Sequence, residues 1–162
     1  MSQHPDVTSP ADRAAQIEAA NDELIAFIET CTDEEWARTC EAEGWPVAVV
    51  AHHIAWGHHV AAGWIRTIAS GHDIPGSPEL HDAGNAAKAA EATGTTREEV
   101  IALARRNIVE LAEVVRSLTD ADLAKSSPFG PAGGRPMSVD RLAGARGHLD
   151  RHLGSIRAAV GR

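Results

Sequence analysis

The chain holds nine histidines in 162 residues, and six of them fall within two short stretches. The second stretch, residues 148–152, reads His-Leu-Asp-Arg-His, so His148 and His152 are four residues apart. On an α-helix this spacing turns the two side chains by about 40° and separates them by about 6 Å along the axis, so both imidazoles can reach one ion. Taken alone, the pair is also compatible with two solvated histidines at the edge of a helix.

The first stretch carries His52-His53 and, further on, His58-His59. His53 lies beside Ile54 on the apolar side of the expected helix and is predicted to point inward, whereas His52, His58 and His59 are predicted at the surface or rim. A single inward histidine is usually a core residue, but a facing helix with two more histidines changes this expectation. Three neutral imidazoles with one open position are typical of a catalytic divalent metal, with zinc as the first expectation and nickel or iron as alternatives.

The elements that must position these histidines are predicted to be helices. Alanine accounts for 30 residues, and it is the strongest helix former and is depleted in strands, so the composition predicts an all-α protein. Apolar residues recur every three or four positions in four segments. The first predicted helix begins after Ser9 and reaches Cys31, and the second begins near 44–46 and ends at Gly71. The third runs from Thr96 to Leu118, and the fourth runs from Ser138 through Ala145 to Val160.

Shorter elements are expected between these helices. Thr32 and Glu35 form a capping box over a short helix, and a similar turn starts at Thr119. Residues 71–94 form a long connection, within which 85–92 is predicted as a short helix, and the connection is expected to cover one end of the bundle. The segment PFGPAGGRPM is predicted as a connector, and no strand is predicted.

The whole chain, 1–162, is expected to be a single four-helix bundle, with residues 1–9 as a flexible N-terminus. The formal net charge is −8, and aromatic residues make up 4% with no tyrosine, so nucleic-acid binding is not expected. The chain lacks a run of 18 apolar residues and a signal-peptide pattern, so no membrane partner is expected and the location is predicted to be cytoplasmic.

Other catalytic patterns are weak or missing. Cys31 and Cys40 are nine residues apart and are expected to be reduced thiols with a packing or surface role. Asp150 is about 200° around the helix from His148 and is expected to face solvent. A P-loop, a G-x-S-x-G elbow and the glutamate of H-E-x-x-H are all missing from the sequence.

Two segments carry a resemblance to a known family. GWPVAVVAHHIAWGHH is similar to the second helix of the DinB-like (YfiT-like) metalloenzymes, in which a histidine follows a Gly-Trp pair at the place of His53 rather than His52. RGHLDRHLGSIRAAV resembles the last helix of the family, with its His-x-x-x-His pair. The resemblance implies a four-helix bundle with up-down-down-up connections and a divalent metal on His53, His148 and His152. Some relatives carry a glutamate where this chain has His148.

The resemblance also implies a class of reaction. Relatives in this family include mycothiol-dependent maleylpyruvate isomerase and bacillithiol S-transferases. The chain is therefore expected to be an S-transferase or isomerase that uses a small-molecule thiol such as mycothiol, an electrophile and a divalent metal, with a homodimer as a possible assembly. Trp56 or Trp64 and the connection 71–94 are expected to line the pocket. The alternatives are a non-catalytic metal-binding or stress-related bundle, and a bundle whose histidines are only structural.

Overall fold

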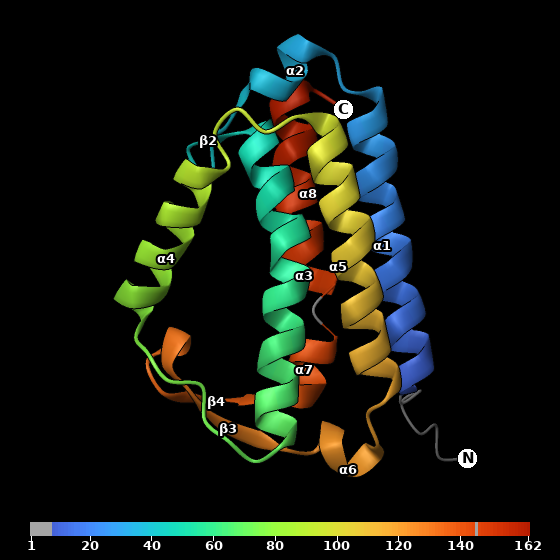
Figure 1. Ribbon diagram of the computed structural model, residues 1–162, viewed down its shortest axis with the longest axis vertical. Helices are drawn as coiled ribbons and strands as arrows, with labels where there is room; N and C mark the ends of the chain where they lie inside the picture. The colour runs from blue at the N-terminus through green and yellow to red at the C-terminus, as the bar shows by residue number, and fades with distance from the viewer. Residues whose placement is uncertain (1–7, 145) are drawn as a thin grey trace, which may run out of the picture.

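The computed structural model describes residues 8–144 and 146–162. Four long helices form a bundle, as Figure 1 shows: α1 (Pro10–Thr30), α3 (Val47–Ala69), α5 (Arg97–Arg116) and α8 (Arg146–Val160). Helices α1 and α8 run in one direction and α3 and α5 in the other (Figure 1), which is the up-down-down-up order expected from the sequence. The all-α prediction is confirmed. Most of the predicted flexible N-terminus, residues 1–7, lies outside the described residues.

The helices begin where their capping signals stand. The Ser9 hydroxyl accepts a hydrogen bond from the backbone N–H of Asp12 at 3.1 Å, and Pro10 occupies the first helical position. Such caps satisfy backbone donors that have no partner inside the helix. Equivalent capping boxes start α2 (Asp33–Ala37), where Thr32 and Glu35 predict one, and also α5 and α6 (Asp120–Leu123).

The connection after α3 contains a longer helix than the sequence predicts. Helix α4 (Pro78–Glu91) begins seven residues before the predicted segment 85–92, because the Ser77 hydroxyl caps it and Pro78 fits its first position. Instead of covering one end of the bundle, α4 runs along the outer side of α3, as Figure 1 shows. None of its residues is fully buried.

Two short antiparallel pairs of strands occur where no strand is predicted, and one of these strands lies at the predicted start of the second helix, near 44–46. Strands β1 (Thr39–Cys40) and β2 (Trp45–Pro46) form one pair, and β3 (Ser126–Phe129) and β4 (Arg135–Ser138) form the other. The second pair lies within and around the PFGPAGGRPM segment and turns through a 3-10 helix, η1 (Gly130–Ala132). Its prolines and glycines hide the alternation that signals a strand, so sequence analysis missed it.

The last predicted helix is divided in two. Helix α7 (Val139–Ala143) ends at Gly144, whose backbone leaves the helical region, and α8 begins at Arg146. The prediction of one continuous helix is therefore wrong, and Ala145, which the prediction placed within it, lies outside the described residues.

The core consists of two apolar clusters with a polar layer at their junction. On α3 the first cluster ends at Ala55 and the second begins at Ala62. Three buried polar side chains lie at this level, one from each of three helices: Asn21, His58 and Asn107. Within the described part of the chain, no helix combines the length and the apolar character needed to cross a membrane.

Candidate metal centre

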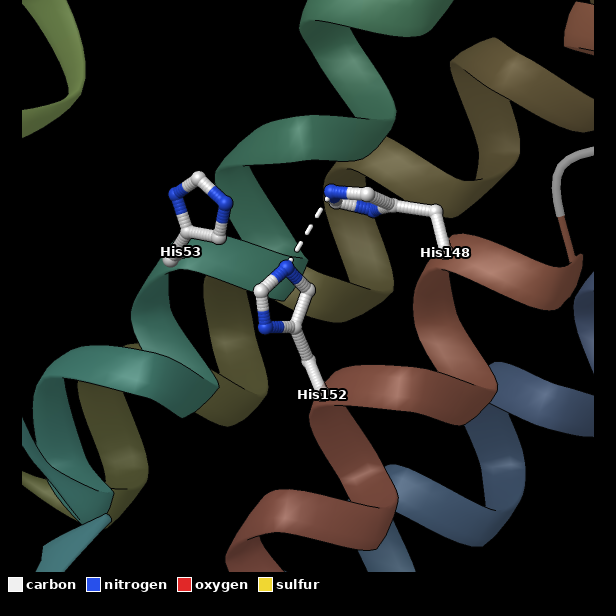
Figure 2. Close-up of side chains that lie close together, drawn as sticks. All are labelled: His53, His148 and His152. Carbon is white, nitrogen blue, oxygen red and sulfur yellow. Dashed lines mark hydrogen bonds between the residues drawn. The ribbon is translucent and has the colours of Figure 1, made fainter. Parts of the chain in front are cut away.

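His53, His148 and His152 meet at the junction of α3 and α8. One ring nitrogen of each lies within 4.8 Å of those of the other two. The closest pair is Nε2 of His148 and Nε2 of His152, which are 3.2 Å apart (Figure 2). The structure thus brings together the three histidines that the sequence singled out, from positions up to 99 residues apart in the chain.

The local structure of the two helices explains this arrangement. His148 and His152 are one turn apart on α8, so their rings lie on one side of the helix, edge to face, with centroids 4.5 Å apart. Helix α3 runs antiparallel beside α8, and the His53 ring faces the pair, with its centroid 5.0 Å from that of His152. His152 is buried, His53 is half-buried and His148 keeps part of its surface open to solvent.

A glutamate that sequence analysis missed orients His152. Glu43 lies in the turn between β1 and β2, and its Oε1 accepts a hydrogen bond from Nδ1 of His152 at 2.7 Å. The Ser155 hydroxyl donates to Oε2 of the same carboxylate at 2.5 Å. With the proton on Nδ1, the lone pair of His152 is on Nε2, which faces the other two histidines. Nothing in the sequence marks Glu43, because it is 109 residues from His152 and is one of 23 acidic residues.

Electrostatics keep this cluster in the form that binds cations. Burial, followed by repulsion from His152, lowers the pKa of His53 to about 4. Desolvation and the neighbouring imidazoles of His152 and His53 lower the pKa of His148 to about 3. Burial opposes ionisation of Glu43, but hydrogen bonds from Ser155 and His152 outweigh it and lower the pKa of this carboxyl. At neutral pH, His53 and His148 are therefore uncharged imidazoles, the form that can bind a cation, and Glu43 is a carboxylate.

These residues fit a divalent metal. Ligand nitrogens about 2.05 Å from a tetrahedral ion are about 3.3 Å from one another, which the 3.2 Å separation of the His148 and His152 nitrogens already approaches. The third nitrogen, on His53, lies within 4.8 Å, so small side-chain rotations would complete the set. Among residues 8–144 and 146–162, the cluster includes no fourth His, Cys, Asp or Glu ligand. Three neutral imidazoles with an open position suit zinc, and also nickel or iron.

The other histidines of the first stretch differ in their surroundings. His59 is exposed, as predicted, and its Nδ1 is 2.7 Å from the carboxylate of Glu110. His52 is half-buried, which agrees with a rim position. The rim prediction is wrong for His58, which is 6% exposed and whose Nε2 hydrogen bonds to Oδ1 of Asn21 at 2.9 Å. The buried partner on α1 explains the difference, since it satisfies a polar ring inside the core.

Aromatic residues and α4 surround the outer side of the cluster. The Trp45 ring lies edge-on to His53 with centroids 5.6 Å apart, and the Trp56 centroid is 6.3 Å away. Lys88 of α4 places its ammonium group 5.7 Å from the Trp56 ring. Trp64 instead packs against residues beyond the cluster, with Phe129 at 4.8 Å. Of the two tryptophans expected to line a pocket, Trp56 is therefore the one that adjoins the histidines.

The remaining candidates take no part in the cluster. Cys31 and Cys40 are both buried and free, as expected for packing thiols. Burial, followed by the nearby charge of Glu43, raises the pKa of Cys40 to about 11, so this thiol stays protonated. Asp150 faces solvent as predicted and pairs with Arg146, with the atoms 3.1 Å apart.

The comparison with protein families agrees with the fold and the cluster. The model of the DinB superfamily matches residues 16–156, which include α3 and α5 in full, most of α1 and α8, and all three histidines. The chain belongs to the DinB superfamily. No curated protein and no solved structure gave a significant match.

Proposed function

We propose that this chain is a metal-dependent enzyme that uses a low-molecular-weight thiol as a cosubstrate for S-transfer or isomerisation. The observation that carries the proposal is the cluster of three histidine imidazoles without a fourth His, Cys, Asp or Glu side chain among the described residues. Catalytic sites keep such a position open, whereas structural zinc sites are closed by four protein ligands.

Each residue of the site has a distinct task in this proposal. His53, His148 and His152 hold the ion, and Glu43 fixes the orientation of the His152 ring. A bound divalent ion supplies the positive charge that holds a thiol as its thiolate at neutral pH. Trp45 and Trp56 border His53 and exclude water from one side of the reacting groups.

The reaction proposed is a nucleophilic addition or substitution by sulfur. The thiol gives its proton to solvent, and the sulfur forms a bond with an electrophilic carbon. In a transfer reaction the leaving group departs with the electron pair of the broken bond. In an isomerisation the electron pair is held within the adduct until the sulfur leaves again. Zinc is the metal proposed first, with nickel and iron as alternatives, and mycothiol is the thiol proposed first.

Cobalt substitution tests this proposal directly. Cobalt(II) bound to the three histidines should give a visible spectrum, and addition of mycothiol should change it as sulfur enters the open position. The His148→Ala variant should lose both the spectrum and any transferase rate, whereas His59→Ala, on the exposed side of α3, should keep both. A stoichiometric cobalt spectrum that ignores every physiological thiol would refute the thiol-dependent mechanism.

One observation favours a second candidate, a non-catalytic metal-binding bundle. Both carboxylate oxygens of Glu43 are engaged, by His152 and Ser155, so this group is committed to orientation and not to proton transfer. A metal that resists exchange and a cobalt spectrum indifferent to thiols would support this candidate. The predicted homodimer can be tested separately by sedimentation of the metal-loaded protein.

A further inference from the structure

A small cavity lies inside the bundle beside the metal centre. Its volume is about 40 Å³, and its apolar walls include Ile17, Ile54 and Leu111, which come from three different helices. His148 lines the same cavity, so any group placed there adjoins the cluster of three histidines. His58, the buried histidine of the polar layer, also lines it.

The hydrogen bond between His58 and Asn21 determines which atom of the ring the cavity meets. Nε2 of His58 donates to Oδ1 of Asn21 at 2.9 Å, so the lone pair of the neutral ring is on Nδ1. Within the described part of the chain, Nδ1 has no hydrogen-bond partner. Every side-chain nitrogen or oxygen that is fully enclosed there does have a partner, so Nδ1 is not fully enclosed. Nδ1 is therefore open to a space, and the cavity is the space that His58 lines.

This atom is an acceptor that needs a donor. Burial lowers the pKa of His58 to about 4, so the ring is neutral at physiological pH and Nδ1 cannot itself donate. An acceptor that faces apolar walls without a partner is unfavourable, and a ligand that supplies a donor there gains from it. The cavity thus combines mostly apolar walls with this buried acceptor, and Arg146 and His148 line it as well. Apolar walls with a few polar groups are the usual composition of a small-molecule site.

We propose that this cavity is a subsite for a short apolar group of the substrate that ends in a hydroxyl or another hydrogen-bond donor, which donates to Nδ1 of His58. A water needs about 10–15 Å³ of such space, so the cavity accepts about three or four heavy atoms. The bound group lies next to His148, which both the cavity and the metal centre share. That the bound group belongs to a substrate rests on the proposed function. The binding itself does not require turnover.

Two glycines of α3 provide a matched pair of variants. Gly57 lines the cavity, and a Cβ atom added there would meet nothing within 4 Å. A Cβ atom at Gly63 would also meet nothing, but this glycine is exposed and away from the cavity. Gly57→Val should therefore fill the cavity, and Gly63→Val should leave it empty, while both keep α3 helical. Gly57→Ala, which only adds a methyl group, is the milder variant of the same kind.

The test is a titration of the zinc-loaded, histidine-labelled protein, followed by the nitrogen-15 resonances of His58 in NMR spectra. Isopropanol, which has a donor, is compared with acetone, which has a similar size and shape but no hydroxyl. Isopropanol should cause a saturable shift of the Nδ1 resonance with millimolar affinity, and acetone should not. Gly57→Val should weaken this binding at least tenfold, Gly57→Ala should weaken it less, and Gly63→Val should not change it.

Three results would overturn the proposal: a shift without saturation, the same shift with acetone, or unchanged binding in a folded Gly57→Val variant. Each would mean that no ligand in this cavity donates a hydrogen bond to Nδ1 of His58. The NMR titration involves no thiol, so its failure leaves the thiol-dependent function standing. A cobalt spectrum that ignores thiols, in turn, leaves the cavity proposal standing.

Discussion

Replacement of Glu43 should weaken metal binding although this residue does not touch the metal. Its carboxylate accepts hydrogen bonds from His152 and Ser155 at 2.7 and 2.5 Å. Once His152 gives the lone pair of Nε2 to a cation, its Nδ1–H becomes a stronger donor, so the carboxylate stabilises the metal-bound state more than the free state. The side chains of His152 and Glu43 are only 9% and 11% exposed, so solvent screens this interaction weakly.

The magnitude follows from the kind of hydrogen bond that is lost. Glu43→Gln keeps an oxygen that accepts from His152 but removes the charge, and a charge-assisted hydrogen bond is roughly twice as strong as a neutral one. We expect a loss of ~1.4 kcal/mol, which is about tenfold in metal affinity. Glu43→Ala removes both hydrogen bonds. Its metal affinity should fall by close to a hundredfold, or about 2.7 kcal/mol, which is the upper limit for residues that orient a metal ligand.

Zinc affinity of both variants can be measured by competition with a chromophoric chelator at neutral pH. Glu41→Gln is the matched control, since Glu41 is exposed in the same turn and its replacement should change nothing. Thermal unfolding of the metal-free proteins separates an effect on the site from a loss of folding. Affinities of both Glu43 variants within twofold of the wild type would refute the orienting role.

Three further predictions concern the histidines and one glycine. His53→Ala should abolish metal retention and His52→Ala should leave it within about twofold, as elemental analysis would reveal; the opposite result would mean that His52 is the ligand. Burial holds the pKa of His58 near 4, while an unfolded histidine takes up its proton near pH 6.5, so the free energy of unfolding should fall by up to ~3 kcal/mol as the pH drops from 7 towards 4. Urea titrations would measure this loss, and His58→Gln should remove the share that His58 contributes, leaving the shares of His53 and His148, whose pKa values are also lowered. Gly130→Ala should destabilise the fold by about 1–3 kcal/mol, because its Cβ would lie 2.6 Å from the backbone of Gly76. Gly84→Ala should not destabilise it, because a Cβ there would meet nothing within 4 Å. Equal melting temperatures for the two variants would contradict the clash.

The sequence was sufficient for the elements whose formation depends on neighbouring residues. The starts of α1 and α5 follow from Ser9 and Thr96, since a capping box needs only residues three positions apart. The pairing of His148 with His152 follows in the same way from the pitch of a helix. The resemblance to a family added the third histidine, His53, which no local rule connects with α8.

The sequence failed where a local rule competes with a distant contact. The strands β3 and β4 form although prolines and glycines disfavour them, because the chain pairs with itself and Ile74 adds a bridge to Phe129. The helix predicted across Gly144 is broken, and α7 is held by the ion pair between Asp140 and Arg13 of α1, with the atoms 2.7 Å apart. Neither partner can be found from spacing along the chain.

The sequence and the tertiary structure determined different features of the site. The sequence by itself determined the residue types of the cluster, the helices that carry them and the inward face of His53, since helical periodicity places residues on a face. Only the tertiary structure assigned Glu43 to His152, at a separation of 109 residues, and buried His58 against Asn21, at a separation of 37. The cavity beside His148 likewise exists only where four helices meet. Hydrogen bonds and cavities between helices depend on how those helices pack, and the packing of a bundle is a property of the whole chain.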